Sequence, residues 1–310
     1  MSVPGRQAGV TWVTPQKLPP FRVFASRVIA GLFEFAAIAS RIRQMRVRFW
    51  GVRGSVPYAT SDSIGHGCNT PCLELVNEET DRRLILDAGS GIIGVGARID
   101  SAGGCAILLT HYHWDHLQGL PFFAPLHLRG SSVTLWAPVL GRPFTDIETM
   151  FRSPFFPVPY DRLPSPPAIE NVAGGDLTIN GFEVSVQALN HPGGAFAYRI
   201  KGSSGDLVYA TDHEFGDTEI DAALNRFSSG AAALILDSHF APDEMSNRTG
   251  WGHSDWGQCA NFAAECDAER LWLFHHKPGR SDGDMKTIAE AARRVFRRTD
   301  TAKEGEAFFV

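Results

Sequence analysis

The sequence lacks the features of repetitive, fibrous and membrane-spanning proteins. Its 310 residues contain no low-complexity tract and no internal repeat at the periods of solenoids or propellers. The apolar segment at 28–39 is too short to span a bilayer and contains Glu34, so we expect no transmembrane segment. With 44% hydrophobic and 20% charged residues, the chain can bury one large core or two modest ones.

Cysteine is scarce, and its spacing argues against a disulfide framework or a cysteine zinc finger. The five cysteines are an odd set, and Cys68 and Cys72 are separated by three residues rather than two. Reduced thiols are typical of the cytoplasm, so we expect a cytoplasmic protein.

An overall surplus of positive charge, which binding to a long nucleic acid would require, is also missing. The net charge is −5 at pH 7, so we expect no stable nucleic-acid binding. The first 44 residues differ from the rest, because they hold six basic residues against Glu34 alone. We interpret residues 1–44 as a basic N-terminal extension that takes no part in catalysis. Three interpretations compete: an amphipathic basic helix that touches a membrane or partner, a docking helix, and a mis-assigned start with translation beginning at Met45. We favour the last two.

Metal-binding side chains are concentrated in the segment Thr110-His-Tyr-His-Trp-Asp-His116, directly after the apolar run 106–109. In an extended chain, side chains two residues apart point the same way, so His111 and His113 can bind one metal together. Asp115 and His116 point elsewhere and can bind a second. Crowding of this kind is costly unless the groups are paired, which favours a metal site over a structural role.

Three further candidate ligands each follow a strand-like apolar run. His191 comes after the run 182–189, Asp212 after 207–210, and His275 after 271–274. Sheet ends present side chains on rigid supports, so we expect these three to meet the 111–116 segment.

The order of predicted elements indicates an α/β fold. Polarity alternation and β-branched or aromatic runs predict strands at 46–50, 72–76, 83–87, 106–110, 133–137, 182–189, 196–201, 207–211, 232–237, 271–275 and 306–310. Helical patterns lie near 115–120, 143–151, 217–227, 254–266 and 282–297. Ser254 is the expected cap of the helix near 254–266. Strands dominate early and then interleave with helices, which suits an αββα four-layer sandwich.

The segment 110–116, with His191, Asp212 and His275, resembles the metallo-β-lactamase superfamily in its HxHxDH two-metal form. Further stretches resemble the phosphodiesterase-like branch, which includes ribonuclease Z and the cyclic phosphodiesterase of the carbon–phosphorus lyase pathway. These are Phe49-Trp-Gly-Val-Arg-Gly-Ser-Val-Pro57, Cys68-Asn-Thr70, Leu86-Asp-Ala-Gly-Ser-Gly91, His191-Pro-Gly-Gly194, Gly252-His-Ser254 and Phe274-His-His276. The resemblance covers residues 45–310, which we take as the metallo-β-lactamase-like hydrolase domain.

The resemblance implies the αββα fold of the metallo-β-lactamase type and a set of metal ligands. It assigns the first metal to His111, His113 and His191, the second to Asp115, His116 and His275, and a bridging position to Asp212. The expected cofactors are two divalent metal ions, with Zn²⁺ favoured and Mn²⁺ or Fe as alternatives. We also expect Asp87, in the turn after a predicted strand, to orient a ligand histidine.

The expected chemistry is hydrolysis by a hydroxide that bridges the two metals. By the resemblance, His253 of the Gly-His-Ser stretch would donate a proton to the leaving group. His276 is the second candidate donor, and Asp115 counts as a candidate catalytic residue besides being a ligand. The resembling enzymes pair the donor with a glutamate near the bridging aspartate, and Glu214 is the expected substitute here.

Two reaction classes remain open from the sequence. The first is a phosphodiesterase on a small, cyclic nucleotide-like phosphodiester, because only twenty residues separate His191 and Asp212 and leave no room for a tRNA-gripping arm. The alternative is a lactonase, thioesterase or β-lactamase-like hydrolase of C–O or C–N bonds. A non-catalytic protein with a structural metal ranks lowest, since structural zinc sites are usually rich in cysteine. A homodimer is compatible with the sequence. The proline- and aromatic-rich segment 154–167 is either a lid over the metals or a satellite hydrophobic cluster.

Overall fold

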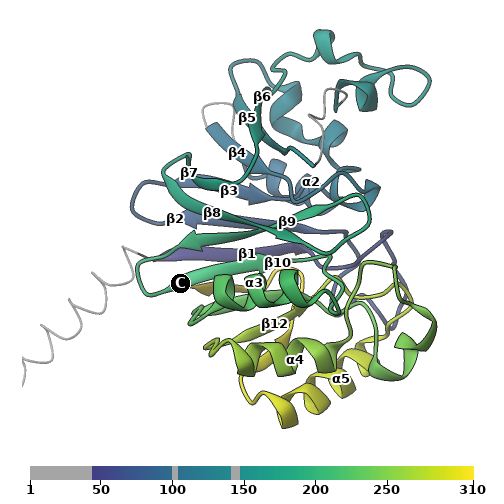
Figure 1. The fold of residues 1–310 in the computed structure, drawn as a ribbon. Helices are drawn as coiled ribbons and strands as arrows, with labels where there is room; N and C mark the ends of the chain where they lie inside the picture. The colour runs from purple at the N-terminus through teal and green to yellow at the C-terminus, as the bar shows by residue number, and fades with distance from the viewer. Residues whose placement is uncertain (1–43, 100–103, 141–146) are drawn as a thin grey trace, which may run out of the picture. The chain divides into compact units, whose positions relative to one another are not determined.

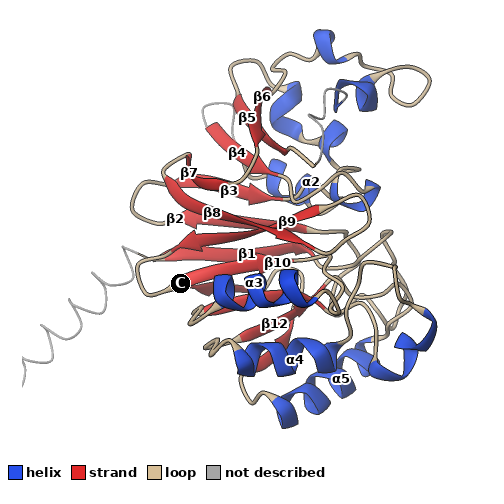
Figure 2. Ribbon diagram, in the orientation of Figure 1, coloured by secondary structure: helices blue, strands red, loops and turns tan. Residues whose placement is uncertain are grey.

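A computed structural model describes residues 44–99, 104–140 and 147–310, and the following description is restricted to them (Figure 1). The predictions made for the basic extension therefore lie outside the described residues, apart from its last position. In the described part, two seven-stranded sheets lie face to face, as the strands of Figure 2 show. No helix in this part of the chain has the length and apolar character needed to cross a bilayer.

The first sheet combines the N-terminal strands with the last strand of the chain, in the order β14-β1-β2-β3-β4-β5-β6. Its strands are β1 (Met45–Gly51), β2 (Cys72–Asn77), β3 (Arg82–Leu86), β4 (Gly104–Leu108), β5 (Ser132–Pro138), β6 (Ala168–Val172) and β14 (Ala307–Phe309). Strand β1 alternates strictly between buried and half-buried residues, as a strand with one face in a core must. The strands from β3 to β6 run parallel to one another.

The second sheet has the order β13-β12-β11-β10-β9-β8-β7. Its strands are β7 (Gly175–Ile179), β8 (Phe182–Leu189), β9 (Ala195–Lys201), β10 (Asp206–Ala210), β11 (Ala233–Asp237), β12 (Leu271–Phe274) and β13 (Thr299–Thr301). Strands β10 to β13 are parallel, and β11 and β12 are buried along their whole length. Buried parallel strands of this kind are covered on both faces.

Three hydrophobic clusters define the layers of this domain. The central cluster joins the inner faces of the two sheets, with Phe49 and Trp272 as large members whose ring centroids are 5.3 Å apart. A second cluster packs helices α3 (Thr218–Ser228), α4 (Trp256–Glu265) and α5 (Asp282–Val295) on the second sheet. A third packs helix α2 (Ile92–Gly96) and several 3-10 turns on the first sheet. The predicted four-layer αββα arrangement is confirmed.

The three long helices match their predictions, and two shorter ones do not. Residues 114–122 form two 3-10 turns, Trp114–His116 and Leu120–Phe122, instead of the helix predicted near 115–120. Gly119 and Pro121 explain the difference, because glycine disfavours a helix interior and proline lacks the N–H that the helix needs. Residues 147–151 are also a 3-10 turn, and 143–146 lie outside the described residues.

The predicted cap of α4 is wrong by one residue. The Asp255 carboxylate accepts hydrogen bonds from Gly257 N and Gln258 N, so Asp255 caps the helix. Ser254 Oγ instead donates to His213 O, and it thereby ties the start of α4 to the segment that follows β10.

The aromatic segment 154–167 packs mostly as a satellite cluster. The ring centroid of Phe156 lies 5.7 Å from that of Phe151 and 5.5 Å from that of Phe122. Tyr160 also packs on Phe151, which is fully buried in the third cluster. Phe155 is the one large hydrophobic side chain of this segment that is strongly exposed, at 83%. The cluster hypothesis, one of the two left open by the sequence, is therefore the better description.

Candidate metal centre

The predicted ligands all lie where strands of the two sheets end. Asp87 follows β3, the 110–116 segment follows β4, His191 follows β8, Asp212 follows β10 and His275 follows β12. Asp87, Asp212 and His275 have φ values of 62°, 58° and 58°. This left-handed conformation turns the chain sharply at the strand end. The two sheets are joined at this edge, because Tyr198 OH donates to Leu109 O at 2.5 Å.

The first group consists of three imidazoles, His111, His113 and His191. Their nearest nitrogens all lie within 4.8 Å of one another, and His191 Nε2 approaches His113 Nδ1 to 2.9 Å. His111 and His191 are buried, whereas His113 is exposed. The structure thus brings together the three residues that the sequence predicted for a first metal.

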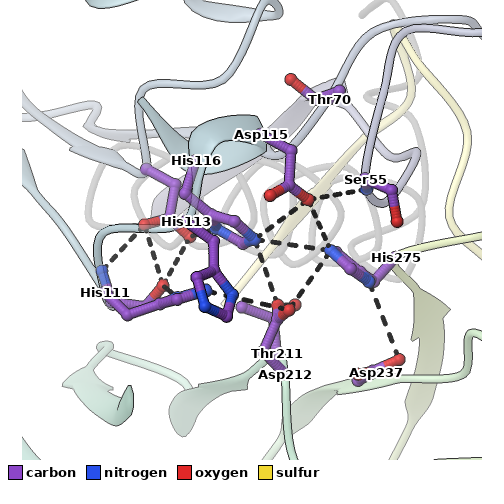
Figure 3. Close-up of polar contacts among 12 residues, drawn as sticks. Ser55, Thr70, His111, His113, Asp115, His116, Thr211, Asp212, Asp237 and His275 are labelled. Carbon is purple, nitrogen blue, oxygen red and sulfur yellow. Dashed lines mark hydrogen bonds and ion pairs between the residues drawn. The ribbon is translucent and has the colours of Figure 1, made fainter. Parts of the chain in front are cut away.

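The second group consists of Asp115, His116 and His275, which Figure 3 shows turned toward one another. His275 Nε2 is 3.1 Å from Asp115 Oδ2 and 3.4 Å from His116 Nε2. All three are buried. The backbone N–H of Ser55 donates to Asp115 Oδ2 at 2.7 Å, and this contact fixes the carboxylate against the loop after β1.

Asp212 lies between the two groups. Its Oδ1 is 4.0 Å from His111 Nε2 and 3.9 Å from His191 Nε2, and its Oδ2 is 3.2 Å from His116 Nε2. Its Oδ1 is also 3.4 Å from His275 Nε2. One carboxylate therefore faces histidines of both groups.

Three of these histidines have the nitrogen that points away from the cluster held by a protein oxygen. His116 Nδ1 donates to Asp87 at 2.9 Å, as expected for Asp87, and His191 Nδ1 donates to Gly252 O at 2.8 Å. His111 Nδ1 lies 3.0 Å from Thr110 Oγ1. An outer partner of this kind fixes the tautomer and leaves Nε2 free as a metal ligand, which is the usual arrangement around metal-binding histidines.

Asp87 is a buried support for this arrangement. Its carboxylate accepts hydrogen bonds from Thr110 N at 2.8 Å, Tyr209 OH at 2.8 Å and the Thr110 hydroxyl, besides His116. The side chain is completely buried. These contacts connect β3, β4 and β10 directly behind the cluster.

The imidazoles of the first group and the Asp212 carboxylate differ in charge. Burial lowers the pKa of His111 and His191, and partial burial of its ring lowers that of His113, so these imidazoles are neutral and have lone pairs for a cation. Burial also opposes charge on Asp212, yet the imidazoles of His275 and His116 hold its pKa well below the usual range. Asp212 is therefore ionised.

The residues present fit a divalent metal. His111 Nε2 is buried and has no hydrogen-bond partner, although an unsatisfied buried ring nitrogen costs free energy. It points into a cluster of imidazoles and carboxylates, which is the donor set of Zn²⁺ sites and is also compatible with Mn²⁺ or Fe. A cation in the cluster would satisfy this nitrogen.

His253, the first predicted proton donor, lies beside the cluster and is paired with Asp237, which was not predicted from the sequence. Its Nδ1 is 2.6 Å from Asp237 Oδ2 and 3.8 Å from Asp212 Oδ1. Burial lowers the pKa of His253, but the Asp237 carboxylate outweighs it, and the pKa rises to about 9. Asp237 ends β11, so the same strand-end signal that marked the ligands could have revealed it.

The expected partner of His253, Glu214, has a different task. Its carboxylate accepts from Gly250 N at 2.7 Å and Gly252 N at 2.6 Å, and no hydrogen bond or ion pair joins it to His253. A further histidine that was not predicted, His239, stacks on His253 with ring centroids 4.5 Å apart.

The second predicted donor, His276, is not brought to the cluster. Its Nε2 donates to Ala302 O at 2.9 Å, and its ring lies 6.3 Å from that of His66. His276 is only 1% exposed, and its backbone pairs with that of Arg53 in the loop after β1. Its neighbour His275 points the other way, into the second group.

Comparison with known proteins identifies the family. Residues 82–276, more than half of the chain, match the model of the β-lactamase superfamily domain, so the chain belongs to this superfamily. The matched segment contains every candidate ligand. With the fold and the histidine and aspartate cluster, this makes the protein a metal-dependent hydrolase of the metallo-β-lactamase fold.

Two relatives illustrate the similarity in sequence. Ribonuclease Z of Bradyrhizobium sp. (strain ORS 278) is 27% identical, over 83% of this chain and 96% of the relative. The probable metallo-hydrolase YhfI of Bacillus subtilis (strain 168) is 26% identical, over 74% of this chain and 86% of the relative.

Solved structures agree on the fold. The crystal structure of Bacillus subtilis YhfI gives a TM-score of 0.63 at 21% identity, covering 86% of this chain and all of that one. A diphosphatase of the PhnP family gives 0.62 at 18% identity, covering 86% of this chain and 97% of that one.

Proposed function

We propose that this protein is a binuclear metal-dependent phosphodiesterase that acts on a small, cyclic nucleotide-like phosphodiester, with His253 as the proton donor. The observation that carries the proposal is the Asp237–His253 pair beside Asp212, at 2.6 Å and 3.8 Å. An alkoxide leaving group needs a proton, and a histidine held by a carboxylate can supply it. Hydrolysis of a lactone or β-lactam needs no strong acid at this position.

His111, His113 and His191 would hold one metal, and Asp115, His116 and His275 the other, with Asp212 shared. Bound cations at such a site make a water molecule acidic near neutral pH and stabilise the negative charge that develops on phosphoryl oxygens. Zn²⁺ is the favoured ion. Asp115 enters the proposal as a ligand, because its Oδ2 is already engaged by Ser55 N and His275 Nε2.

The chain's own contribution to proton transfer is made by His253. Asp237 accepts from its Nδ1 and orients the ring, and the same carboxylate favours the protonated imidazole. Nε2 then carries the proton that passes to the leaving oxygen as the P–O bond breaks. Glu214 supports the proposal indirectly, since it fixes the backbone on the N-terminal side of His253.

Two observations favour phosphorus and a small substrate over the C–O and C–N alternative. A ribonuclease and a diphosphatase are among the similar proteins. Between His191 and Asp212 the chain forms only the β9–β10 hairpin, which leaves no inserted arm to hold a large RNA.

The test compares two leaving groups in His253→Ala. With 2′,3′-cyclic AMP, whose leaving group is an alkoxide, we expect kcat to fall by about 10²–10⁴-fold. With bis(p-nitrophenyl) phosphate the loss should be much smaller, because nitrophenolate leaves without a proton. Asp237→Asn should reproduce the difference, and the metal content of both variants should equal that of the wild type.

The exposed His127, whose Nε2 contacts Pro121 O, provides a matched histidine control, and His127→Ala should leave both rates unchanged. Equal losses with the two substrates would refute the donor role. Hydrolysis of lactones with no turnover of either phosphodiester would establish the alternative reaction class instead.

A further inference from the structure

An exposed tryptophan stands two residues before the proposed donor. The side chain of Trp251 is 55% exposed, and its neighbours Gly250 and Gly252 have φ values of 82° and 80°. Two left-handed glycines allow a tight turn that projects the residue between them outward. A single exposed aromatic residue is common on protein surfaces and does not by itself indicate a binding site. The position of the turn that carries Trp251 is therefore the relevant observation.

The turn is fixed directly to the candidate metal centre. Glu214, two residues after Asp212, is only 9% exposed, and its carboxylate accepts from both Gly250 N and Gly252 N. On the other side, Gly252 O accepts from His191 Nδ1 at 2.8 Å. The indole of Trp251 therefore has a set position relative to His191 and Asp212.

A guanidinium that forms no ion pair lies against this indole. Arg248 Cζ is 4.4 Å from the centroid of the Trp251 ring and 5.6 Å from that of Phe240. Within the described part of the chain, Arg248 makes no ion pair and no side-chain hydrogen bond, and its Nε is buried without a partner. The nearby cations Lys277 and Arg280 are both paired with Glu244. Of these three cations, Arg248 is the one that contacts the indole and forms no ion pair.

The indole and the proposed donor pack against the same buried residue, Phe240. The Phe240 ring centroid lies 6.3 Å from that of Trp251 and 6.1 Å from that of His253. A planar group carried by an ester of a phosphate bound beside His253 can therefore reach the indole. A small sugar or alkyl ester has no planar face to use there.

We propose that Trp251, held in place by Arg248, binds the nucleobase of the substrate, so that the natural substrate is a nucleoside phosphodiester. The base stacks on the face of the indole that Arg248 does not cover, and the guanidinium supports the opposite face. This inference rests on the proposed function, because it places the scissile phosphate beside His253. Stacking on an aromatic side chain contributes enough binding to be measured, and it tolerates different bases.

The test measures KM and kcat of the metal-loaded enzyme with two cyclic diesters, 2′,3′-cyclic AMP and glycerol 1,2-cyclic phosphate, which has no base. Trp251→Ala should raise KM for the nucleotide by about 5- to 150-fold, with kcat changed less than twofold. The glycerol substrate should be unaffected. Trp251→Phe should restore most of the affinity, and Arg248→Gln should weaken nucleotide binding by a smaller factor.

Phe309, 51% exposed on β14 and paired with Arg46 at the far end of β1, provides the matched aromatic control. Phe309→Ala should not alter either KM. Adenosine 3′-monophosphate should also quench the tryptophan fluorescence of the wild type saturably, and Trp251→Phe should abolish this quenching.

The outcomes separate the two proposals. If the wild type hydrolyses neither diester, the proposed function fails, and the quenching experiment still decides the inference. Equal effects of Trp251→Ala on both substrates, or no saturable quenching of the wild type, would overturn the nucleobase site while leaving phosphodiester hydrolysis intact.

Discussion

The two groups of candidate ligands differ in charge and in exposure. His111, His113 and His191 are neutral imidazoles, and His113 is exposed. The other group includes the ionised carboxylate of Asp115 and is buried throughout. There, burial lowers the pKa of His116, but Asp212, Asp115 and Asp87 together raise it well above its usual value.

This difference indicates unequal metal positions. A carboxylate adds charge neutralisation to the second group, and burial shields it from competing water. The all-imidazole group relies on Asp212 for negative charge and is open at His113. We therefore expect the second position to hold its metal more tightly and the first to exchange faster.

The largest expected effect comes from removing the shared carboxylate. Asp212→Ala leaves both groups without the oxygens that face them, so metal content should fall from two to below one per chain. Loss of a residue that only hydrogen-bonds a metal ligand lowers activity by about 10–100-fold. Turnover of Asp212→Ala should fall by more than this, because Asp212 faces the metals directly. Elemental analysis and kinetics measure both. Asp221→Ala removes a carboxylate that pairs with His213 outside the cluster and should keep two metals.

A pair of glycine variants addresses each group separately. A Cβ at Gly54 would lie 2.4 Å from His275 Cε1, and a Cβ at Gly252 would lie 2.2 Å from His191 Nδ1. Gly54→Ala should therefore weaken the second position, and Gly252→Ala, which also has an unfavourable φ, should weaken the first. Competition with a chelator should show one altered affinity in each variant.

Gly216→Ala is the control for this pair, since Gly216 also has a positive φ but its Cβ would meet no atom within 4 Å. It should lose some stability and keep both metals. If Gly54→Ala and Gly252→Ala both lower the affinity for metal at the same position, the division into two positions is wrong.

A smaller effect is expected from the outer partner of His116. Asp87→Asn weakens the acceptor behind His116 Nδ1 and should lower metal affinity at the second position by about 10–100-fold. The first position should change less, because Asp87 reaches His111 only through the Thr110 hydroxyl. Titration of the metal-free protein with Zn²⁺ would reveal two steps, and a uniform shift of both would contradict this order.

Much of the centre could be predicted because each ligand follows a strand of its own. The apolar runs before His191, Asp212 and His275 are detectable in the sequence, and strand ends at one edge of the sheets must lie close together. Asp237 follows the same rule at the end of β11 and could have been found. Its pairing with His253 could not, because Glu214 is an equally reasonable partner until the turn at 250–252 is placed.

The fold was predicted in its layers and long helices, and less well in its turns. Residues 114–122 have the apolar pattern of a helix, but Gly119 and Pro121 restrict them to 3-10 turns. Strands β6 and β7 are largely exposed, so their sequences lack the apolar signal on which strand prediction depends. The cap of α4 was misplaced because Ser254 and Asp255 are both good capping residues.

The most direct test of the central claim is anomalous diffraction from crystals of the Zn²⁺-loaded protein, combined with elemental analysis. We predict two peaks per chain, one bound by His111, His113 and His191, the other by Asp115, His116 and His275, with Asp212 contacting both. A single peak, or peaks at His239 and His253 with the 111–116 segment unliganded, would contradict it.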